Sequence, residues 1–203
     1  MDNFDPALIS VVMPCYNAAP YVEEAVQSVL GQTYPQVELI VVDDGSTDGS
    51  TEILQRLATE YPERVSVVYQ NRAGPFVARN HALAHANGNF IAFLDADDTW
   101  HPDALRRMHE ALEAELADVA WCGWQAFGPT ATDTQPNSPP EFDAAEAVGH
   151  FMQHGTWPLN SMLIRRQLID ELRGFSERTP TAMDYDLWLR LLARQPQLVL
   201  VPE

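Results

Sequence analysis

Residues 90–100 read Phe-Ile-Ala-Phe-Leu-Asp-Ala-Asp-Asp-Thr-Trp, so five apolar residues run directly into three carboxylates within four positions. An apolar run of this length is typical of a buried strand, which places Asp95, Asp97 and Asp98 where that strand ends. In an open α/β sheet, ligands bind outside the carboxyl ends of the strands. Carboxylates this close need a balancing cation or hydrogen-bond donors, and a hard divalent cation that also binds phosphate is the natural partner. The alternative is a solvated acidic turn.

Three strand–helix units precede this stretch. Apolar, largely β-branched runs predict strands at residues 8–13, 37–42 and 65–69, with the fourth at 90–94. Helical spacing of apolar residues predicts helices at 21–32, around 53–57, and from Pro75 to Ala84. Four strand–helix units in succession predict an α/β fold with a parallel, doubly wound sheet of nucleotide-binding type.

The predicted strand order brings two acidic strand ends together. Right-handed crossovers place the first strand between the second and the fourth, so the switch point lies between the first and fourth strands. Asp43 and Asp44 follow the second strand, and the acidic cluster follows the fourth. A solvated turn does not predict this convergence on one crevice. Asp43 itself is more readily explained as structural than as ligand-binding.

The second half of the chain continues the same domain. We expect helices at 104–116, 144–154 and 184–192, and strands at 118–127, 160–164 and 198–201. Residues 128–140 are rich in Pro, Thr, Ser, Asn and Gln, which predicts either a mobile loop over the site or a tolerated surface insertion. The sequence has no repeat and no clear second domain, and its length suits one well-buried domain, so 1–203 is predicted to be a single domain.

The composition narrows the class of partner. The formal net charge is −17, and all twelve positive residues are Arg. An acidic chain of this kind argues against nucleic acid and against simple electrostatic docking on anionic lipid. No apolar run reaches membrane-spanning length, and the N-terminus is acidic, unlike a signal peptide. Cys15 and Cys122 are predicted to be free thiols in a reducing cytoplasm.

Five motifs, taken in order, resemble the family 2 glycosyltransferases of the GT-A fold. They are Val11-Val12-Met13-Pro14-Cys15-Tyr16-Asn17, Val41-Val42-Asp43-Asp44-Gly45-Ser46-Thr47-Asp48, Ala78-Arg79-Asn80, Phe93-Leu94-Asp95-Ala96-Asp97-Asp98 and Asp184-Tyr185-Asp186-Leu187-Trp188-Leu189-Arg190. Each motif is short, but their order and spacing together are specific and cover nearly the whole chain. The resemblance implies a nucleotide-sugar-binding half at 1–100 and an acceptor and catalytic-base half at 101–203.

The resemblance implies a nucleotide-binding role for five residues. Pro14 and Tyr16 would lie against the base, and Asp44 would accept a hydrogen bond from a base N–H. Arg79 would help to hold the nucleotide, although a plain surface charge is the alternative for this residue. Asp95 would contact the ribose. UDP is the expected nucleotide by analogy, with GDP and dTDP left open.

The resemblance also implies the metal and the base. Asp97, with Asp98 assisting, would bind Mn²⁺ or Mg²⁺ on the diphosphate of the donor. Because the chain has no Lys, a metal at Asp97 is the expected neutraliser of the leaving diphosphate. Asp184 would be the general base of an inverting transfer, and a helix cap is its alternative.

Three departures from the family pattern stand out. Met183 takes the place where many relatives have Glu, beside the expected base. Gly174 and Phe175 stand in Arg-Gly-Phe where relatives have Gly-Gly-Phe, and with Trp157 they are candidates for the donor-sugar or acceptor side. Many relatives continue past the equivalent of Glu203, so the chain is either a truncated domain or a minimal member. The Gln-x-x-Arg-Trp element of processive membrane synthases is missing, which favours transfer of one sugar.

Two alternatives compete with this prediction. Asp95-Ala96-Asp97-Asp98-Thr99 fits the nucleophile motif of haloacid-dehalogenase-like phosphatases, although that class needs a downstream Lys. The second alternative is an inactive or incomplete nucleotide-sugar-binding module. We expect a cytoplasmic enzyme of polysaccharide, cell-envelope or glycolipid synthesis. Its acceptor is a lipid carrier, a glycan or a protein, with peripheral membrane contact as one option.

Overall fold

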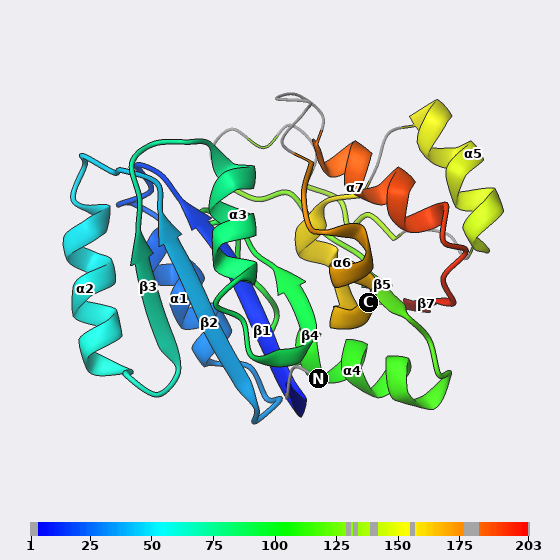
Figure 1. Cartoon of the computed structure of the whole chain (residues 1–203), viewed down its shortest axis with the longest axis horizontal. Coiled ribbons are helices and arrows are strands. Elements are labelled where there is room, and N and C mark those ends of the chain that lie inside the picture. The colour runs from blue at the N-terminus through cyan, green and yellow to red at the C-terminus, as the bar shows by residue number, and fades with distance from the viewer. Residues whose placement is uncertain are drawn as a thin grey trace.

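The computed structural model describes residues 4–128, 131, 134–138, 142–154, 157–176 and 183–202. One seven-stranded sheet runs through these residues, with strand order β3-β2-β1-β4-β6-β5-β7 (Figure 1). The strands are β1 (Asp5–Cys15), β2 (Val37–Asp43), β3 (Val65–Tyr69), β4 (Gly88–Phe93), β5 (Val119–Cys122), β6 (Met162–Arg165) and β7 (Leu198–Val201).

The first four strands form the predicted parallel sheet. β1 pairs with β2 on one side and with β4 on the other, and β2 pairs with β3, all in parallel. The strand order reverses between β1 and β4, which confirms the predicted switch point. The apolar runs of β1, β2 and β4 are buried on both faces, as a sheet covered on both sides requires.

Helices cover both faces of the sheet. They are α1 (Val22–Leu30), α2 (Ser50–Glu60), α3 (Pro75–Leu83), α4 (Ala104–Ala114), α5 (Ala144–His154), α6 (Arg166–Leu172) and α7 (Met183–Leu192). Buried residues of α1, α2 and α4 share one apolar core with one face of the sheet. Those of α3, α5, α6 and α7 share a second core with the other face. Figure 1 shows α3 in front of β1 and β2, with α1 behind them.

The predicted strand at 118–127 is wrong in its second half. β5 ends at Cys122, and Trp124 makes only an isolated antiparallel bridge to Asn137. The reason is a close crossing at Gly123, where an added Cβ would lie 2.8 Å from the carbonyl oxygen of Asn137. The chain therefore turns away from the sheet after Cys122. Within the predicted loop at 128–140, residues 129–130, 132–133 and 139–140 lie outside the described residues.

The region around β6 also differs from the prediction. The first residues of the strand predicted at 160–164 form a short 3₁₀ turn, Leu159–Ser161, and β6 runs antiparallel between β4 and β5. The helix α6, which begins directly after β6, was not predicted. Within the described ranges, no helix has the length and apolarity needed to cross a membrane.

Candidate active site

A crevice of about 480 Å³ opens at the carboxyl ends of β1, β2 and β4, at the switch point of the sheet. Seven of the sequence-predicted site residues line it together: Pro14, Tyr16, Asp44, Arg79, Asp95, Asp97 and Asp184. The first six come from the first half of the chain, and Asp184 comes from the first turn of α7. Asp98, Gly174, Phe175 and Trp157 are not among the lining residues.

The end of β2 carries one structural carboxylate and one that faces the crevice. Asp43 accepts hydrogen bonds from the Ser46 N–H (3.0 Å) and the Thr51 hydroxyl (2.5 Å), so it stabilises the turn into α2. This agrees with the structural role expected for Asp43. Asp44 is 3% exposed and lines the crevice.

Asp44 is held by three N–H donors. Its Oδ1 accepts from Gln70 Nε2 (2.7 Å) and from the Ala73 N–H (2.7 Å), and its Oδ2 accepts from the Gly74 N–H (2.8 Å). Gly74 has φ +102°, a backbone conformation that favours glycine. A carboxylate, which only accepts hydrogen bonds, suits a position surrounded by three N–H donors. One acceptor position remains on Oδ2.

Tyr16 presents an aromatic face to the crevice. Its side chain is 38% exposed, and the guanidinium carbon of Arg72 lies 4.0 Å from the centre of its ring. Arg72 is exposed and lines the crevice, yet the sequence analysis did not single it out. Its only sequence signal is a cation in the loop between β3 and α3, and one Arg in a polar loop is not distinctive.

A buried arginine lies beneath the acidic wall of the crevice. The side chain of Arg79 is 5% exposed, and its Nη2 lies 2.5 Å from Asp95 Oδ1. Its Nη1 lies 3.9 Å from Asp184 Oδ1. The alternative of a plain surface charge at Arg79 is therefore wrong, because the guanidinium is buried between two carboxylates.

Asp184 combines partial burial with a neighbouring cation. Burial raises the pKa of Asp184, Arg79 opposes the rise, and Asp95 adds to it. The side chain is still 44% exposed, but Oδ1 is buried without a hydrogen-bond partner, so the carboxylate is reached from the crevice through Oδ2. The first turn of α7 favours the ionised form. The side chain of Met183 lies outside the described part of the structure.

The three carboxylates after β4 have different surroundings. Asp95 is paired with Arg79, and Asp97 is exposed to the crevice. Asp98 accepts a hydrogen bond from Asn160 Nδ2 (2.5 Å), and burial, with Asp95 as the next contributor, raises its pKa to about 6. Within the described ranges, no group of three His, Cys, Asp or Glu side chains forms a metal cluster. The exposed carboxylate of Asp97 fits a cation that takes its other ligands from substrate phosphates and water.

The three candidates for the donor-sugar or acceptor side, Gly174, Phe175 and Trp157, do not line the crevice. Phe175 is buried against the ring of Phe93 (centroids 5.2 Å apart), and Gly174 lies beside Asn80. Trp157 is 4% exposed and packs edge-on against Trp121 (centroids 4.1 Å apart). The structure therefore places Trp157 in the core, where it has no free face for a sugar.

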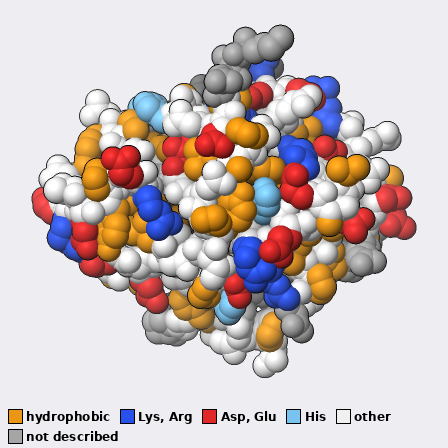
Figure 2. All heavy atoms as spheres, turned by 90° about the horizontal axis from the view of Figure 1, so that it is seen from below, with side chains coloured by type: hydrophobic (Ala, Val, Ile, Leu, Met, Phe, Trp, Pro, Cys, Tyr) orange, Lys and Arg blue, Asp and Glu red, His pale blue; other side chains and the backbone are white. Residues whose placement is uncertain are grey.

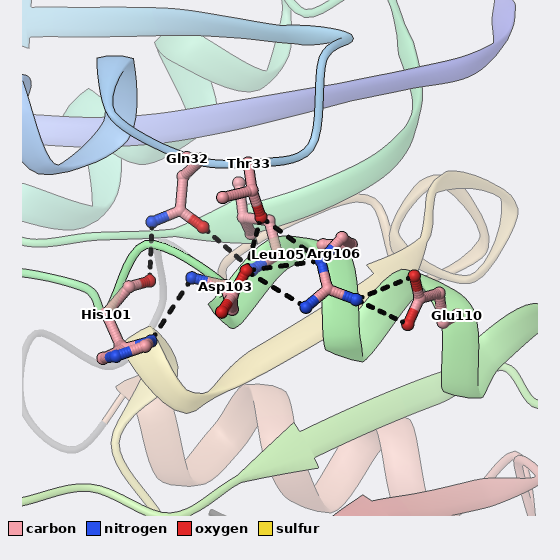
Figure 3. A network of polar contacts seen from close by, with 7 residues as sticks. All are labelled: Gln32, Thr33, His101, Asp103, Leu105, Arg106 and Glu110. Atoms are coloured by element: carbon pink, nitrogen blue, oxygen red, sulfur yellow. Dashed lines mark hydrogen bonds and ion pairs between the residues drawn. The ribbon is translucent and has the colours of Figure 1, made fainter.

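The loop after the acidic cluster is anchored by the network in Figure 3. The buried side chain of Gln32 donates to the His101 carbonyl (2.9 Å) and accepts from the Leu105 N–H (3.0 Å). The Thr33 hydroxyl donates to Asp103 (2.7 Å), and Arg106 pairs with the same carboxylate (3.1 Å). The contacts fix the start of α4 to the end of α1 and limit the freedom of the loop that carries Asp97.

A larger hollow of about 930 Å³ runs along the edge strand β7 and the start of α5. None of the sequence-predicted site residues is among those that line it.

Figure 2 shows the molecule from below relative to Figure 1, and on this face Arg side chains are interspersed with acidic ones. That pattern is unlike the basic face needed for a nucleic acid backbone.

Comparison with known sequences identifies relatives. The sequence model described as "Glycosyl transferase family 2" matches residues 10–178. A Bacillus subtilis (strain 168) protein named "Putative teichuronic acid biosynthesis glycosyltransferase TuaG" is 42% identical over 133 residues, which are 65% of this chain and 52% of that protein. The B. subtilis "Putative glycosyltransferase EpsE" is 32% identical over 190 residues, 90% of this chain and 66% of its own. The chain spans about half of the first relative and under two-thirds of the second.

Solved structures share the fold. Staphylococcus aureus TarS (residues 1–349, in complex with UDP) superposes with a TM-score of 0.78 at 22% identity, covering 96% of this chain and 57% of that one. The mannosyltransferase PcManGT from Pyrobaculum calidifontis, in complex with GDP-Man and Mn²⁺, gives a TM-score of 0.74 at 23% identity, covering 98% and 58%. The predicted GT-A type of α/β fold is confirmed.

Proposed function

Because the chain belongs to glycosyl transferase family 2, we propose that it is an inverting, metal-dependent glycosyltransferase. It moves one sugar from a nucleoside diphosphate sugar, a UDP-sugar by default, to an acceptor hydroxyl. One observation carries the proposal: three carboxylates, Asp95, Asp97 and Asp184, converge on the crevice at the switch point of the sheet, beside an exposed aromatic ring. Residues 1–100 supply the donor side, and 101–203 supply the base and the acceptor side.

The nucleotide base lies against Tyr16 and Pro14 in this proposal. The remaining acceptor position on Asp44 Oδ2 takes an N–H of the base. Uracil, thymine and guanine offer a ring N–H there, whereas N3 of cytosine is an acceptor and meets the carboxylate unfavourably. Asp95 holds the ribose hydroxyls, and Arg79 stands directly behind Asp95.

Asp97 is the residue that would hold Mn²⁺ or Mg²⁺ together with the diphosphate. Asp98 would assist, and its hydrogen bond from Asn160 holds its carboxylate in place. When bound, such a cation supplies neutralisation of the charge that develops on the leaving diphosphate. The likeness to a structure solved with GDP-Man and Mn²⁺ supports this assignment. The exposed position of Asp97 leaves its oxygens open to a cation.

Asp184 accepts the proton of the acceptor hydroxyl at its carboxylate. The hydroxyl oxygen forms a bond to the anomeric carbon as the bond to the diphosphate breaks, and the bonding pair leaves with the diphosphate. Attack from the face opposite the leaving group inverts the anomeric centre. The carboxylate must be ionised to act, and its raised pKa makes it a stronger base than an ordinary aspartate.

The names of the relatives support a place in cell-envelope polysaccharide synthesis. TuaG is named a putative teichuronic acid biosynthesis glycosyltransferase. Structures of TarS have been solved in complex with UDP and with UDP-GlcNAc. We assign the chain to the cytoplasmic side, where it meets an acceptor on a lipid carrier, a glycan or a protein. The phosphatase alternative does not fit. Asp95, which would be its nucleophile, is paired with Arg79, and the family model that matches the chain is that of the glycosyltransferases.

Thermal unfolding with UDP, GDP, dTDP and CDP, each with and without Mn²⁺, tests the donor site. A ligand at about 100 times its Kd stabilises the folded state by about 2.7 kcal/mol. We expect UDP with Mn²⁺ to raise the melting temperature, CDP to raise it least, and Asp97→Ala to remove the effect of Mn²⁺. No shift with any nucleotide in a folded protein would refute the donor site.

The second candidate function is a nucleotide-sugar-binding module without transfer. The donor-side residues Tyr16, Asp44 and Asp97 line the crevice together, which is enough for nucleotide binding whether or not Asp184 acts as a base. Release of UDP from a panel of UDP-glucose, UDP-galactose and UDP-GlcNAc separates the two. Turnover that is lost in Asp184→Asn supports the transferase, and metal-dependent UDP binding without turnover supports the module.

A further inference from the structure

We propose that Arg79 is a positioning residue that fixes the general base Asp184 relative to the ribose-binding carboxylate Asp95. The inference rests on the proposed function and deepens it, because it assigns Arg79 a role beyond holding the nucleotide. One buried guanidinium joins the donor side of the crevice to the base side.

The burial of the three side chains separates their roles. Arg79 is 5% exposed, whereas Asp95 is 46% exposed and Asp184 is 44% exposed. The two carboxylates therefore face the crevice, and the cation lies behind them. Its Nη2 donates a hydrogen bond to Asp95 Oδ1 (2.5 Å). Its Nη1 lies 3.9 Å from Asp184 Oδ1, a buried atom without a hydrogen-bond partner, so this contact is an ion pair and not a hydrogen bond. A phosphate in the crevice would meet the carboxylates before it reached the guanidinium.

Two aromatic rings hold the guanidinium in place. Its central carbon lies 5.3 Å from the ring centre of Phe76 on α3 and 5.6 Å from that of Phe175. A guanidinium is attracted to the face of an aromatic ring within about 6 Å. Phe175 therefore helps to hold the guanidinium of Arg79 in place. This role needs no contact between Phe175 and a sugar.

A hydrogen-bonded segment sets the distance between Arg79 and Asp184. From α3, the Asn80 side chain donates to the Phe175 carbonyl (2.9 Å) and accepts from the Phe175 N–H (2.8 Å). From α7, Arg190 donates to the carbonyls of Leu172 and Gly174 (both 2.9 Å). The helix that carries Arg79 and the helix that carries Asp184 are thus both tied to residues 172–175.

Three of the sequence motifs meet in this frame. Ala78-Arg79-Asn80 supplies the cation and one tie, Arg173-Gly174-Phe175 supplies the segment between the helices, and the motif that begins at Asp184 ends with the second tie, Arg190. Gly174 has φ +66°, and a Cβ there would lie 2.5 Å from Asn80 Oδ1. The glycine therefore allows Asn80 to reach the Phe175 backbone.

A double-mutant cycle of Arg79→Met and Asp184→Asn tests the inference. The readouts are UDP release from the best donor of the panel above and the Kd of UDP with Mn²⁺ by calorimetry. We expect Arg79→Met to lower kcat by about tenfold or more, because small displacements of catalytic groups have large effects. The Kd of UDP should change by less than about threefold. In the Asp184→Asn background, Arg79→Met should add less than about threefold, since the two residues act together.

Hydrogen exchange provides a readout that needs no turnover. Loss of Arg79 should speed exchange at the first amides of α7 that have an intrahelical partner, from Leu187 on, while exchange in α2 stays unchanged. Arg64→Met is the matched control, because Arg64 is a partly buried arginine on the other side of the fold that donates to the Leu30 carbonyl (3.0 Å). If Arg79→Met does not fold, Arg79→Lys replaces it, with a smaller loss of kcat expected.

The outcomes distinguish this inference from the proposed function. A rise of about tenfold in the Kd of UDP with kcat preserved, or additive losses in the cycle, would show that Arg79 is a nucleotide ligand only. Unchanged exchange in α7 would also overturn the positioning role. If wild type shows no turnover, or if Asp184→Asn retains full turnover, the proposed function fails, and hydrogen exchange still decides whether Arg79 fixes α7.

Discussion

At the scale of single residues, carboxylates with the same chemistry differ in what surrounds them. Asp44 is buried and accepts three N–H bonds, whereas Asp97 is exposed to the crevice. The sequence motif selected both residues, but it contains no information on their burial. The difference decides how each responds to substitution.

We predict that Asp44→Asn destabilises the fold and that Asp97→Asn does not. An amide at position 44 turns a donor toward the N–H groups of Gln70, Ala73 or Gly74, and an unpaired buried polar group costs about 1–3 kcal/mol. Asp97→Asn should stay within about 0.5 kcal/mol of wild type, as exposed substitutions do. Urea unfolding measures both, and equal stabilities would contradict the hydrogen-bond argument.

We predict an acidic limb in the rate of UDP release that belongs to Asp184. A base is inactive when protonated, and burial raises the pKa of Asp184, so the rate should fall as the pH drops below that raised value. Because Arg79 lowers this pKa, Arg79→Met should move the limb to higher pH. Asp98, whose pKa is raised to about 6, is the other residue that could cause this acidic limb. If the limb disappears in Asp98→Asn, it belongs to Asp98 and not to Asp184.

At the scale of elements, residues 172–175, at the end of α6 and just after it, are hydrogen-bonded to both α3 and α7. Gly174 takes a left-handed conformation against Asn80, and Arg190 binds the carbonyls on either side of Arg173. The sequence pattern identified the Arg-Gly-Phe triplet as a departure from the family. It did not show that the triplet joins two helices.

We predict that Gly174→Ala is destabilising by about 1–3 kcal/mol, because the added Cβ lies 2.5 Å from Asn80 Oδ1 at a positive φ. Gly149→Ala is the matched control. Gly149 lies inside α5 with nothing within 4 Å of the added Cβ, so alanine there should stabilise by about 0.5–1 kcal/mol. Thermal melts of the two variants should therefore move in opposite directions, and a shared direction would refute the contact at Asn80.

Elements with a strong periodic signal were predicted well. The strands at 65–69 and 198–201 and the helix at 144–154 have the predicted bounds. The predicted strand at 118–127 was too long, because the crossing of Asn137 over Gly123 is a tertiary contact. The helix α6 was missed because its seven residues begin directly after a strand without a side-chain cap.

At the scale of the whole molecule, the net charge is strongly negative. The chain has 29 acidic residues against 12 arginines. A compact state with this imbalance is destabilised by self-repulsion, and salt screens that repulsion. We predict that raising NaCl from about 10 mM to about 150 mM increases the melting temperature by a few degrees. An equal ionic strength of sodium sulfate serves as the control for chloride binding, and a fall in both salts would contradict the prediction.

The candidate site could be predicted from the sequence to the extent that it depends on the first four strands. Their order follows from right-handed crossovers, and it brings Asp44 and Asp95 to one crevice. The place of Asp184 came from the resemblance alone, because no local pattern shows where a helix 90 residues later will dock. Trp157 could not be placed from sequence, since an aromatic residue in a loop has no periodicity to mark it as core.

The antiparallel strand β6 has a consequence for the order in which the protein is made. All four strands of the donor half, β3-β2-β1-β4, have left the ribosome once Phe93 has emerged. The outer edge of β4 then has no partner until β6 arrives, after the intervening residues 94–161 have been translated. Asp184 follows later still. The nascent chain therefore assembles the strands of the proposed donor side well before it acquires the proposed base. Until β6 arrives, the unpaired edge of β4 is the surface through which an unfinished chain is most exposed to mispairing.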